Sequence, residues 1–91
     1  MYNELVQVIE NNKVMFHFFT FGFNITTEII NHEIHDDCIF LYIHDGKIII
    51  GKDYKVEMCY RPSNLIIECE HCFSLTNNYG GHIGYIYCKK D

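Results

Sequence analysis

Residues 38–51, CIFLYIHDGKIIIG, decide the fold of this chain. They place Asp45-Gly46 between two apolar runs, and Asp-Gly favours the tight turn of a β-hairpin. A two-residue loop at this point pairs Leu41 with Ile50 across the hairpin. One face of the hairpin is then wholly aliphatic, and the other is amphipathic. The aliphatic face holds Ile39, Leu41, Ile43, Ile48 and Ile50, and the amphipathic face holds Cys38, Phe40, Tyr42, His44, Lys47 and Ile49.

A second hairpin is predicted at residues 56–69, because Pro62 suits the second position of a type I turn. The turn sets Val56 opposite Cys69 on the core side, so Cys69 is expected to be interior. On the other side it sets Glu57 opposite Glu68.

Three further elements are predicted from hydrophobic periodicity. Residues 2–11 form a short helix, because Tyr2, Leu5, Val6 and Ile9 share one face. Residues 13–23 are apolar on both alternating sets, which favours a strand buried on both sides, with His17 a hydrogen-bonded core histidine. Residues 82–88 alternate as a last strand after the loop at 76–81.

The segment 25–35 is ambiguous. As a strand, it changes parity between Ile29 and Ile30, which requires a bulge. As a helix, Ile30 and Ile34 are neighbours after a cap at Thr26 or Thr27. We favour the strand.

The composition agrees with a small β-rich domain. The chain has 91 residues, enough for a single domain over 1–91, with fourteen Ile and no Ala. We therefore predict an α+β fold, in which a short N-terminal helix packs on a mostly antiparallel, meander-like sheet of five or six strands.

Charge is concentrated in the first half of the chain. Residues 1–46 carry one Lys and seven Asp or Glu, a net −6, whereas residues 47–91 carry a net +1. Direct nucleic-acid binding is disfavoured because it needs a basic surface, and an electropositive protein partner fits better. The first residues lack the pattern of a signal peptide, and a run long enough to cross a membrane is absent. A cytoplasmic protein is therefore expected. The abundance of Ile, Lys, Asn, Phe and Tyr matches an AT-rich genome, a bias that phages share, so the compartment would be the host cell if a phage encodes the protein.

The five cysteines are an odd number, which favours reduced thiols. Cys69 and Cys72 form a C-x2-C knuckle that could supply half of a structural zinc site. Further ligands would come from Cys59, His71, His82 or Cys88. A redox use of the knuckle is weaker, because a helix does not follow it.

Catalytic motifs are not recognisable. The spacing in His32-Glu33-Ile34-His35 is one residue short of the zinc-protease pattern, and on a strand the two histidines would point oppositely. Glu57 and Glu68 could form an acid–base pair, although an exposed, soluble surface is the simpler interpretation. We expect a protein that is not an enzyme.

The preferred hypothesis is a small acidic protein that binds and inhibits a partner with a basic surface, such as a nuclease or defence effector. It is of the general kind seen in phage anti-defence and toxin-immunity proteins. The residues assigned to partner binding are Glu28, Glu33, Asp36, Asp37, Phe40, Tyr42, Glu57 and Glu68. Two alternatives stay open. The first is a zinc-stabilised adaptor. The second is a ligand-sequestering module whose pocket is lined by Phe40, Tyr42 and Ile49 against Tyr85 or Tyr87, and a homodimer with a shared pocket would suit it.

Overall fold

The computed structural model describes the backbone of residues 2–20, 22–60 and 67–89, and the side chains of these residues except 19, 20, 23 and 67–70. Within these ranges the chain forms one helix and eight strands. They are α1 (Tyr2–Asn11), β1 (Val14–Thr20), β2 (Phe23–Glu28), β3 (Asn31–Ile34), β4 (Cys38–Ile43), β5 (Gly46–Gly51), β6 (Lys55–Met58), β7 (Ile67–Thr76) and β8 (His82–Lys89).

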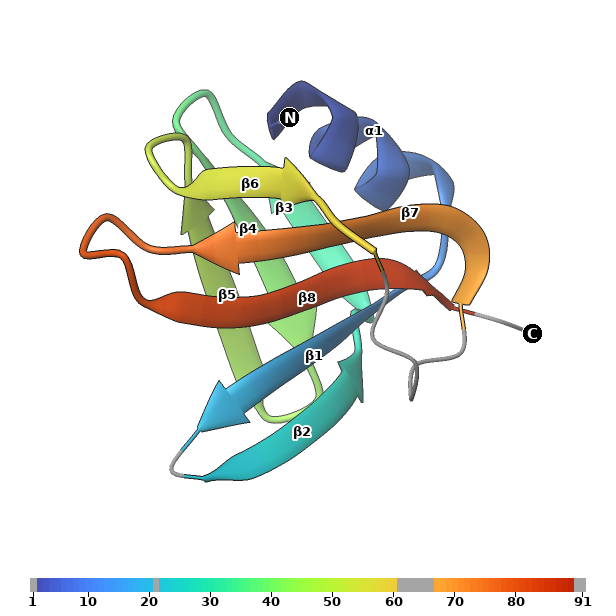
Figure 1. Ribbon diagram of the computed structural model, residues 1–91. Coiled ribbons are helices and arrows are strands. Elements are labelled where there is room, and N and C mark those ends of the chain that lie inside the picture. Colours follow the sequence, from blue (N-terminus) through green and yellow to red (C-terminus); the bar gives the residue numbers. More distant parts are fainter. Residues whose placement is uncertain (1, 21, 61–66, 90–91) are drawn as a thin grey trace.

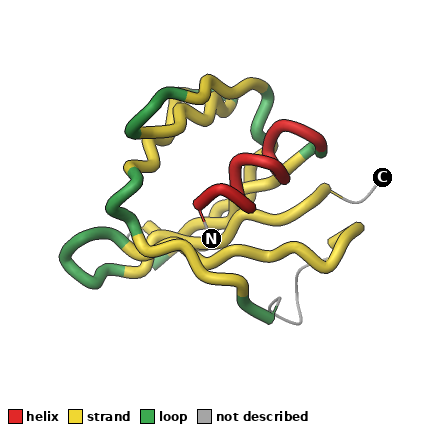
Figure 2. Tube along the Cα trace, turned by 90° about the horizontal axis from the view of Figure 1, so that it is seen from above, coloured by secondary structure: helices red, strands yellow, loops and turns green. Residues whose placement is uncertain are grey.

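The strands make two antiparallel sheets that pack against each other (Figure 1). Sheet A has the order β2-β1-β8-β7-β6, and sheet B has the order β3-β4-β5. Helix α1 lies along the open side between the two sheets, as the view from above shows (Figure 2). The predicted α+β class, with an N-terminal helix on antiparallel strands, is confirmed. The structure describes eight strands rather than the predicted five or six, in part because segment 25–35 divides in two. The strands also form two sheets rather than the predicted single sheet.

The core lies between the sheets and beneath the helix. It draws on α1, on sheet A and on sheet B, and its fully buried side chains are Leu5, Phe16, Ile39, Leu41, Ile50, Phe73, Leu75, Ile86 and Cys88. Because side chains alternate along each strand, every second residue of these strands points into the core. The remaining residues form the outer faces of the two sheets.

Helix α1 has the predicted bounds and buries Leu5, Val8 and Ile9. Its last turn has side-chain partners, because the Asn11 amide donates to the Gln7 carbonyl at 2.8 Å and the Asn12 amide donates to the Val8 carbonyl at 3.1 Å. These bonds give the carbonyls of the last helical turn additional side-chain donors. The sequence Asn11-Asn12 therefore both ends the helix and caps it.

The β4–β5 hairpin has the predicted faces and a different register. Leu41 pairs with Ile48 and Ile39 with Ile50, and the strands close at Ile43 opposite Gly46. The loop is therefore His44-Asp45 rather than Asp45-Gly46. A shift of two residues leaves every side chain on its own face, so the alternation alone could not separate the two registers.

The second predicted hairpin was wrong in register. Val56 pairs with Leu75 rather than Cys69, and Glu57 lies opposite Ser74 rather than Glu68. The predicted turn at Arg61–Asn64 lies outside the described residues. The error arose because a tight turn at Pro62 was assumed, whereas the pairing of β6 with β7 leaves a longer connection between them.

Segment 25–35 is strand, and its change of parity is a crossing between sheets. The Ile29 amide donates to the Val14 carbonyl in sheet A, and the next amide, that of Ile30, donates to the Tyr42 carbonyl in sheet B. Ile29 is consequently buried, while Ile30 is 63% exposed. The apparent bulge in the sequence is therefore the corner at which the chain leaves one sheet for the other.

The predicted strand over residues 13–23 is wrong in its bounds, because β1 ends at Thr20 and β2 begins at Phe23 after a turn at Gly22. Near its start β1 is covered on both sides, as predicted. Val14 and Phe16 are buried in the core, and His17 is buried on the opposite side, where its Nδ1 lies 2.8 Å from Thr26 Oγ1. The prediction of a hydrogen-bonded, buried histidine is confirmed. Opposite Val14 in the same sheet, Cys88 is disulfide-bonded, so the expectation of reduced cysteines does not hold at that residue.

Candidate functional site

The outer face of sheet B gathers aromatic, aliphatic and charged side chains. We call Glu33, Phe40, Tyr42, Lys47 and Ile49 the aromatic face. Their neighbours in the sequence, such as Leu41 and Ile50, point into the core, so strand alternation turns these five outward. The register brings them together, because Phe40 lies between Glu33 and Ile49, and Tyr42 pairs with Lys47.

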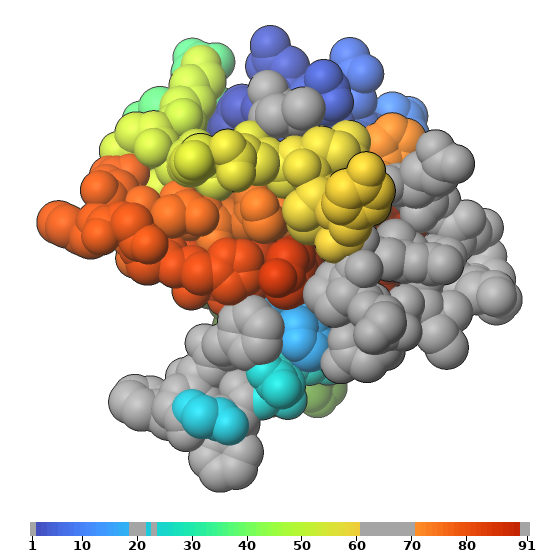
Figure 3. All heavy atoms as spheres, viewed as in Figure 1, coloured from blue at the N-terminus to red at the C-terminus, as the bar shows by residue number. Residues whose placement is uncertain are grey.

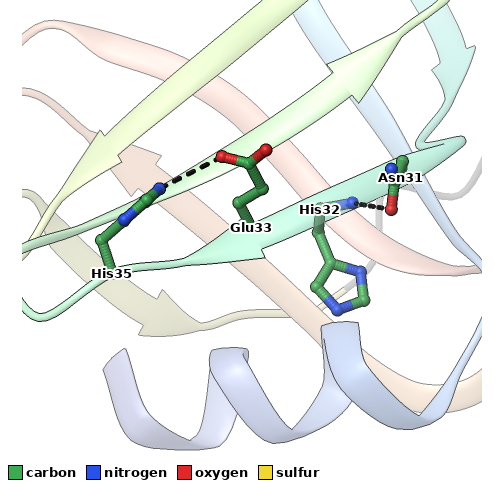
Figure 4. A network of polar contacts seen from close by, with 4 residues as sticks. All are labelled: Asn31, His32, Glu33 and His35. Atoms are coloured by element: carbon green, nitrogen blue, oxygen red, sulfur yellow. Dashed lines mark hydrogen bonds and ion pairs between the residues drawn. The ribbon is translucent and has the colours of Figure 1, made fainter.

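The Phe40 ring is contacted from two sides. Lys47 Nζ lies 4.8 Å from its centroid, and the His35 ring centroid lies 4.7 Å away. His35 Nε2 also lies 3.2 Å from Glu33 Oε2, as Figure 4 shows. A cation over an exposed ring contributes about 0.5–1 kcal/mol. These contacts hold Phe40 in one orientation on the sheet, although the ring stays partly exposed.

Tyr42 is a hydrogen-bond donor on this face. Loss of water around the ring raises the pKa of the Tyr42 phenol, and the hydrogen-bonding carboxylate of Glu33 and its charge raise that pKa further. The phenol therefore holds its proton more tightly than a free tyrosine does, and Glu33 is its acceptor on this face.

Acidic side chains lie at both ends of the aromatic face. Asp36 and Asp37 are exposed in the turn between β3 and β4, and Asp45 is exposed in the turn between β4 and β5. Residues 31–51, which form sheet B and its turns, carry four Asp or Glu against the single base Lys47. Ile49, on the edge strand β5, is 47% exposed on this surface. An apolar surface with an acidic border is thus presented on sheet B.

The other predicted partner-binding acids lie elsewhere. Glu28 is on β2 in sheet A, where its carboxylate accepts a hydrogen bond from Lys89 Nζ at 3.0 Å. Glu57 is on β6, where it forms an ion pair with Lys55 at 3.0 Å. The side chain of Glu68 lies outside the described ones. Of the eight predicted residues, five therefore share sheet B and its first turn, namely Glu33, Asp36, Asp37, Phe40 and Tyr42.

The predicted ligand pocket does not form within one chain, and a pocket shared between two copies stays a prediction. Phe40, Tyr42 and Ile49 lie on the outer face of sheet B, whereas Tyr85 and Tyr87 lie on the outer face of sheet A. The core separates the two groups. The sequence could not show this, because it does not say which strands share a sheet.

The residues considered for metal binding are dispersed. His32 points toward α1 while His35 points toward Glu33, as expected for two positions of opposite parity on one extended segment (Figure 4). Among the residues that the structure describes, His, Cys, Asp and Glu do not form a group of three placed to hold a metal ion. The side chain of Cys69 lies outside the described ones, and Cys72 is buried beside Cys59. The C-x2-C knuckle therefore gains no support as a zinc site.

Sequence reasoning missed a cluster on the outer face of sheet A. Cys72 and Tyr87 are buried there, with Cys59, Met15 and Tyr85 packed against them. Cys59 and Cys72 lie directly opposite each other in the true β6–β7 register, since Met58 pairs with Phe73. The signal that could have found this pair was the hydrophobic pattern of 72–76, which matches β6 better than 65–69 does.

Together these features define a small α+β domain with a fixed aromatic and acidic surface on its smaller sheet. Comparison of the chain with protein-family models, curated proteins and solved structures gives no match. Within the described residues, α1 is too short and too polar to cross a membrane.

Proposed function

We propose that this protein is a non-enzymatic inhibitor that binds a basic protein surface through the aromatic face. The observation that carries the proposal is the pair Phe40 and Tyr42, which lie side by side on β4, partly exposed and bordered by Glu33, Asp36 and Asp37. Aromatic side chains at the centre of a surface contribute most of the binding energy in many protein interfaces. The acidic border adds attraction to a basic partner and orients its approach.

The kind of partner follows from the charge. Proteins that handle nucleic acids carry basic grooves, because they must neutralise phosphates. An acidic surface can occupy such a groove and exclude the nucleic acid. We therefore propose a nuclease or another nucleic-acid-binding effector as the partner, in the manner of anti-defence and immunity proteins.

The first experiment identifies the partner through the face itself. A photo-crosslinking amino acid replaces Ile49 in one variant and exposed Gln7 of α1 in another, and both are irradiated in cells of the source organism. Ile49 is expected to give a covalent adduct with a basic protein, and Gln7 is expected to give none. An adduct from Gln7 alone would contradict the proposal.

The second experiment measures affinity and inhibition with that partner after purification. Changing Glu33, Asp36 and Asp37 to Lys is compared with changing Glu4, Glu10 and Glu57 to Lys, which alters net charge equally on exposed sites away from the aromatic face. The first triple variant is expected to bind roughly 10-fold or more weakly and to lose inhibition of nucleic-acid cleavage or binding, and the second to stay much closer to the unaltered protein. Equal losses in both variants would show that net charge, and not this face, determines binding.

Tyr42→Phe and Tyr42→Ala separate the apolar contact from the hydrogen bond. We expect Tyr42→Ala to weaken binding roughly 10-fold or more, because an aromatic anchor is removed. Tyr42→Phe is expected to lose less, since the ring is kept. Unchanged affinity in both variants would remove Tyr42 from the interface.

A further inference from the structure

Cys59 and Cys72 face each other across two strands of sheet A. The pairing of Met58 with Phe73 continues by one residue, where the Cys59 amide donates to the Cys72 carbonyl at 2.9 Å. Residues directly opposite in an antiparallel pair project their side chains to the same side. The two thiols therefore meet on the outer face of sheet A, where β6, β7 and β8 lie side by side (Figure 3).

The sulfur atoms are in contact without a bond. Cys59 Sγ lies 3.4 Å from Cys72 Sγ and 3.5 Å from the Cys72 carbonyl oxygen. A disulfide has its sulfur atoms about 2.05 Å apart, so bond formation needs a movement of roughly 1.4 Å, which a small side-chain rotation supplies. Cys72 is fully buried against Tyr87, whereas Cys59 is partly exposed.

We propose that Cys59 and Cys72 are a reversible dithiol–disulfide pair that is oxidised by exchange with a small disulfide such as oxidised glutathione. The Cys59 thiolate attacks one sulfur of the small disulfide, which forms a mixed disulfide and releases one small thiolate. The Cys72 thiolate then attacks Cys59 Sγ, which closes the Cys59–Cys72 bond and releases the second small thiolate. The two protein thiols lose two protons and two electrons, and the small disulfide is reduced to two thiols.

The different environments of the two thiols fix this order. Burial raises the pKa of Cys72 to about 12, and the hydrogen bond and charge of Cys59 add to the rise. Cys72 is thus protonated and shielded from reagents in solution, so Cys59 reacts first. Proximity then compensates for the small thiolate fraction of Cys72, because its target sulfur is already in contact.

The bond would tie the end of an edge strand to its neighbour. Strand β6 is the last strand of sheet A, and Cys59 is the residue next to its end. Oxidation would join Cys59 covalently to Cys72 on β7. The chain from position 59 to position 72 would then form a closed loop. The end of β6 would then no longer separate from β7. The aromatic face would not change, because it lies on sheet B.

The test incubates the full chain with oxidised glutathione and maps disulfides by mass spectrometry without reduction. Cleavage after glutamate and then after tyrosine and phenylalanine separates Cys59, Cys72 and Cys88 into different peptides. We expect the peptides of Cys59 and Cys72 to be joined in the unaltered protein. In Cys72→Ala, Cys59 is expected to accumulate as the glutathione mixed disulfide.

Two controls keep the outcome decisive. Cys59→Ala leaves Cys72 buried and is expected to take up no glutathione at Cys72, while circular dichroism confirms that the variant is folded. Cys38→Ala, which removes a thiol on sheet B, is expected to form the Cys59–Cys72 bond at the rate of the unaltered protein. A mixed disulfide at Cys59 that persists in the unaltered protein, or no modification of Cys59 at all, would overturn the proposal.

Discussion

Gly84 is a residue at which β1 and β8 lie in close backbone contact. A Cβ atom at this position would press on the His17 carbonyl oxygen and would lie 2.8 Å from Phe18 Cα. Both are backbone atoms of the paired strand, so they cannot move aside without breaking the β1–β8 ladder. A glycine is therefore required here by contact.

Gly84→Ala is expected to lower the free energy of unfolding by about 2–3 kcal/mol, the size of a typical overpacking effect. Urea denaturation followed by circular dichroism measures the change. Gly46→Ala is the matched control, because nothing lies within 4 Å of its Cβ position. The control should change stability by no more than about 0.5 kcal/mol. Equal effects from both substitutions would contradict the contact argument.

Cys72 makes the free energy of unfolding depend on pH in the alkaline range. Its pKa is raised from 9.0 to about 12 in the folded protein by burial, so the folded chain keeps a proton that the unfolded chain loses. The stabilisation is full below pH 9 and declines as pH rises from 9 to 12. We expect the urea midpoint of anaerobic protein to fall over this range, and to fall less steeply in Cys72→Ala. Parallel profiles for the two proteins would show that Cys72 is not the group responsible.

At the scale of the element, strand alternation reliably predicted which side chains face the core. It placed Ile39, Leu41 and Ile50 inside the core and Phe40 outside it, because one parity of β4 and β5 is wholly aliphatic. Register was predicted less well, since a shift of two residues preserves every face. The β6–β7 register failed because Pro62 suggested a short turn, and turn chemistry does not report the length of a connection.

Helix α1 depends on packing rather than on its own propensity, because ten residues are too few for a stable isolated helix. Leu5→Ala is expected to lower the free energy of unfolding by about 3 kcal/mol, since Leu5 is fully buried. Gln7→Ala, on the exposed side, should have an effect within about 0.5 kcal/mol. Thermal and urea unfolding of both variants measure this. If Leu5→Ala were as stable as Gln7→Ala, the docking of α1 would not support the fold.

At the scale of the whole molecule, the sequence predicted part of the candidate site. The aromatic pair Phe40 and Tyr42 and the acids 33, 36 and 37 are close in the chain, and one hairpin with its preceding strand brings them together. Glu28 and Glu57 are equally acidic, but they belong to sheet A and have basic partners there. Assignment of strands to sheets is set by non-local packing, which local patterns do not contain.

The acidity of sheet B gives binding a dependence on ionic strength. Association with the proposed basic partner is expected to weaken roughly 10-fold between 50 and 300 mM salt, mainly through a slower association rate, because added salt shortens the distance over which exposed charges attract, to about 10 Å at 0.1 M and less above it. Stopped-flow or surface-based kinetics measure both rates. A salt dependence equal to that of the triple Lys variant at Glu33, Asp36 and Asp37 would mean that these acids do not steer the encounter.

The position of β8 between β1 and β7 has a consequence for synthesis on the ribosome. Sheet B is built from residues 31–51, which are adjacent in sequence, so its strands can pair as soon as they emerge. Sheet A cannot, because β1 gains its second neighbour only when residues 82–89 leave the exit tunnel. Until then one edge of β1 and one edge of β7 carry unpaired backbone groups, and unpaired strand edges promote aggregation. Sheet A of the nascent chain is thus expected to stay incomplete until β8 is available to pair with β1 and β7.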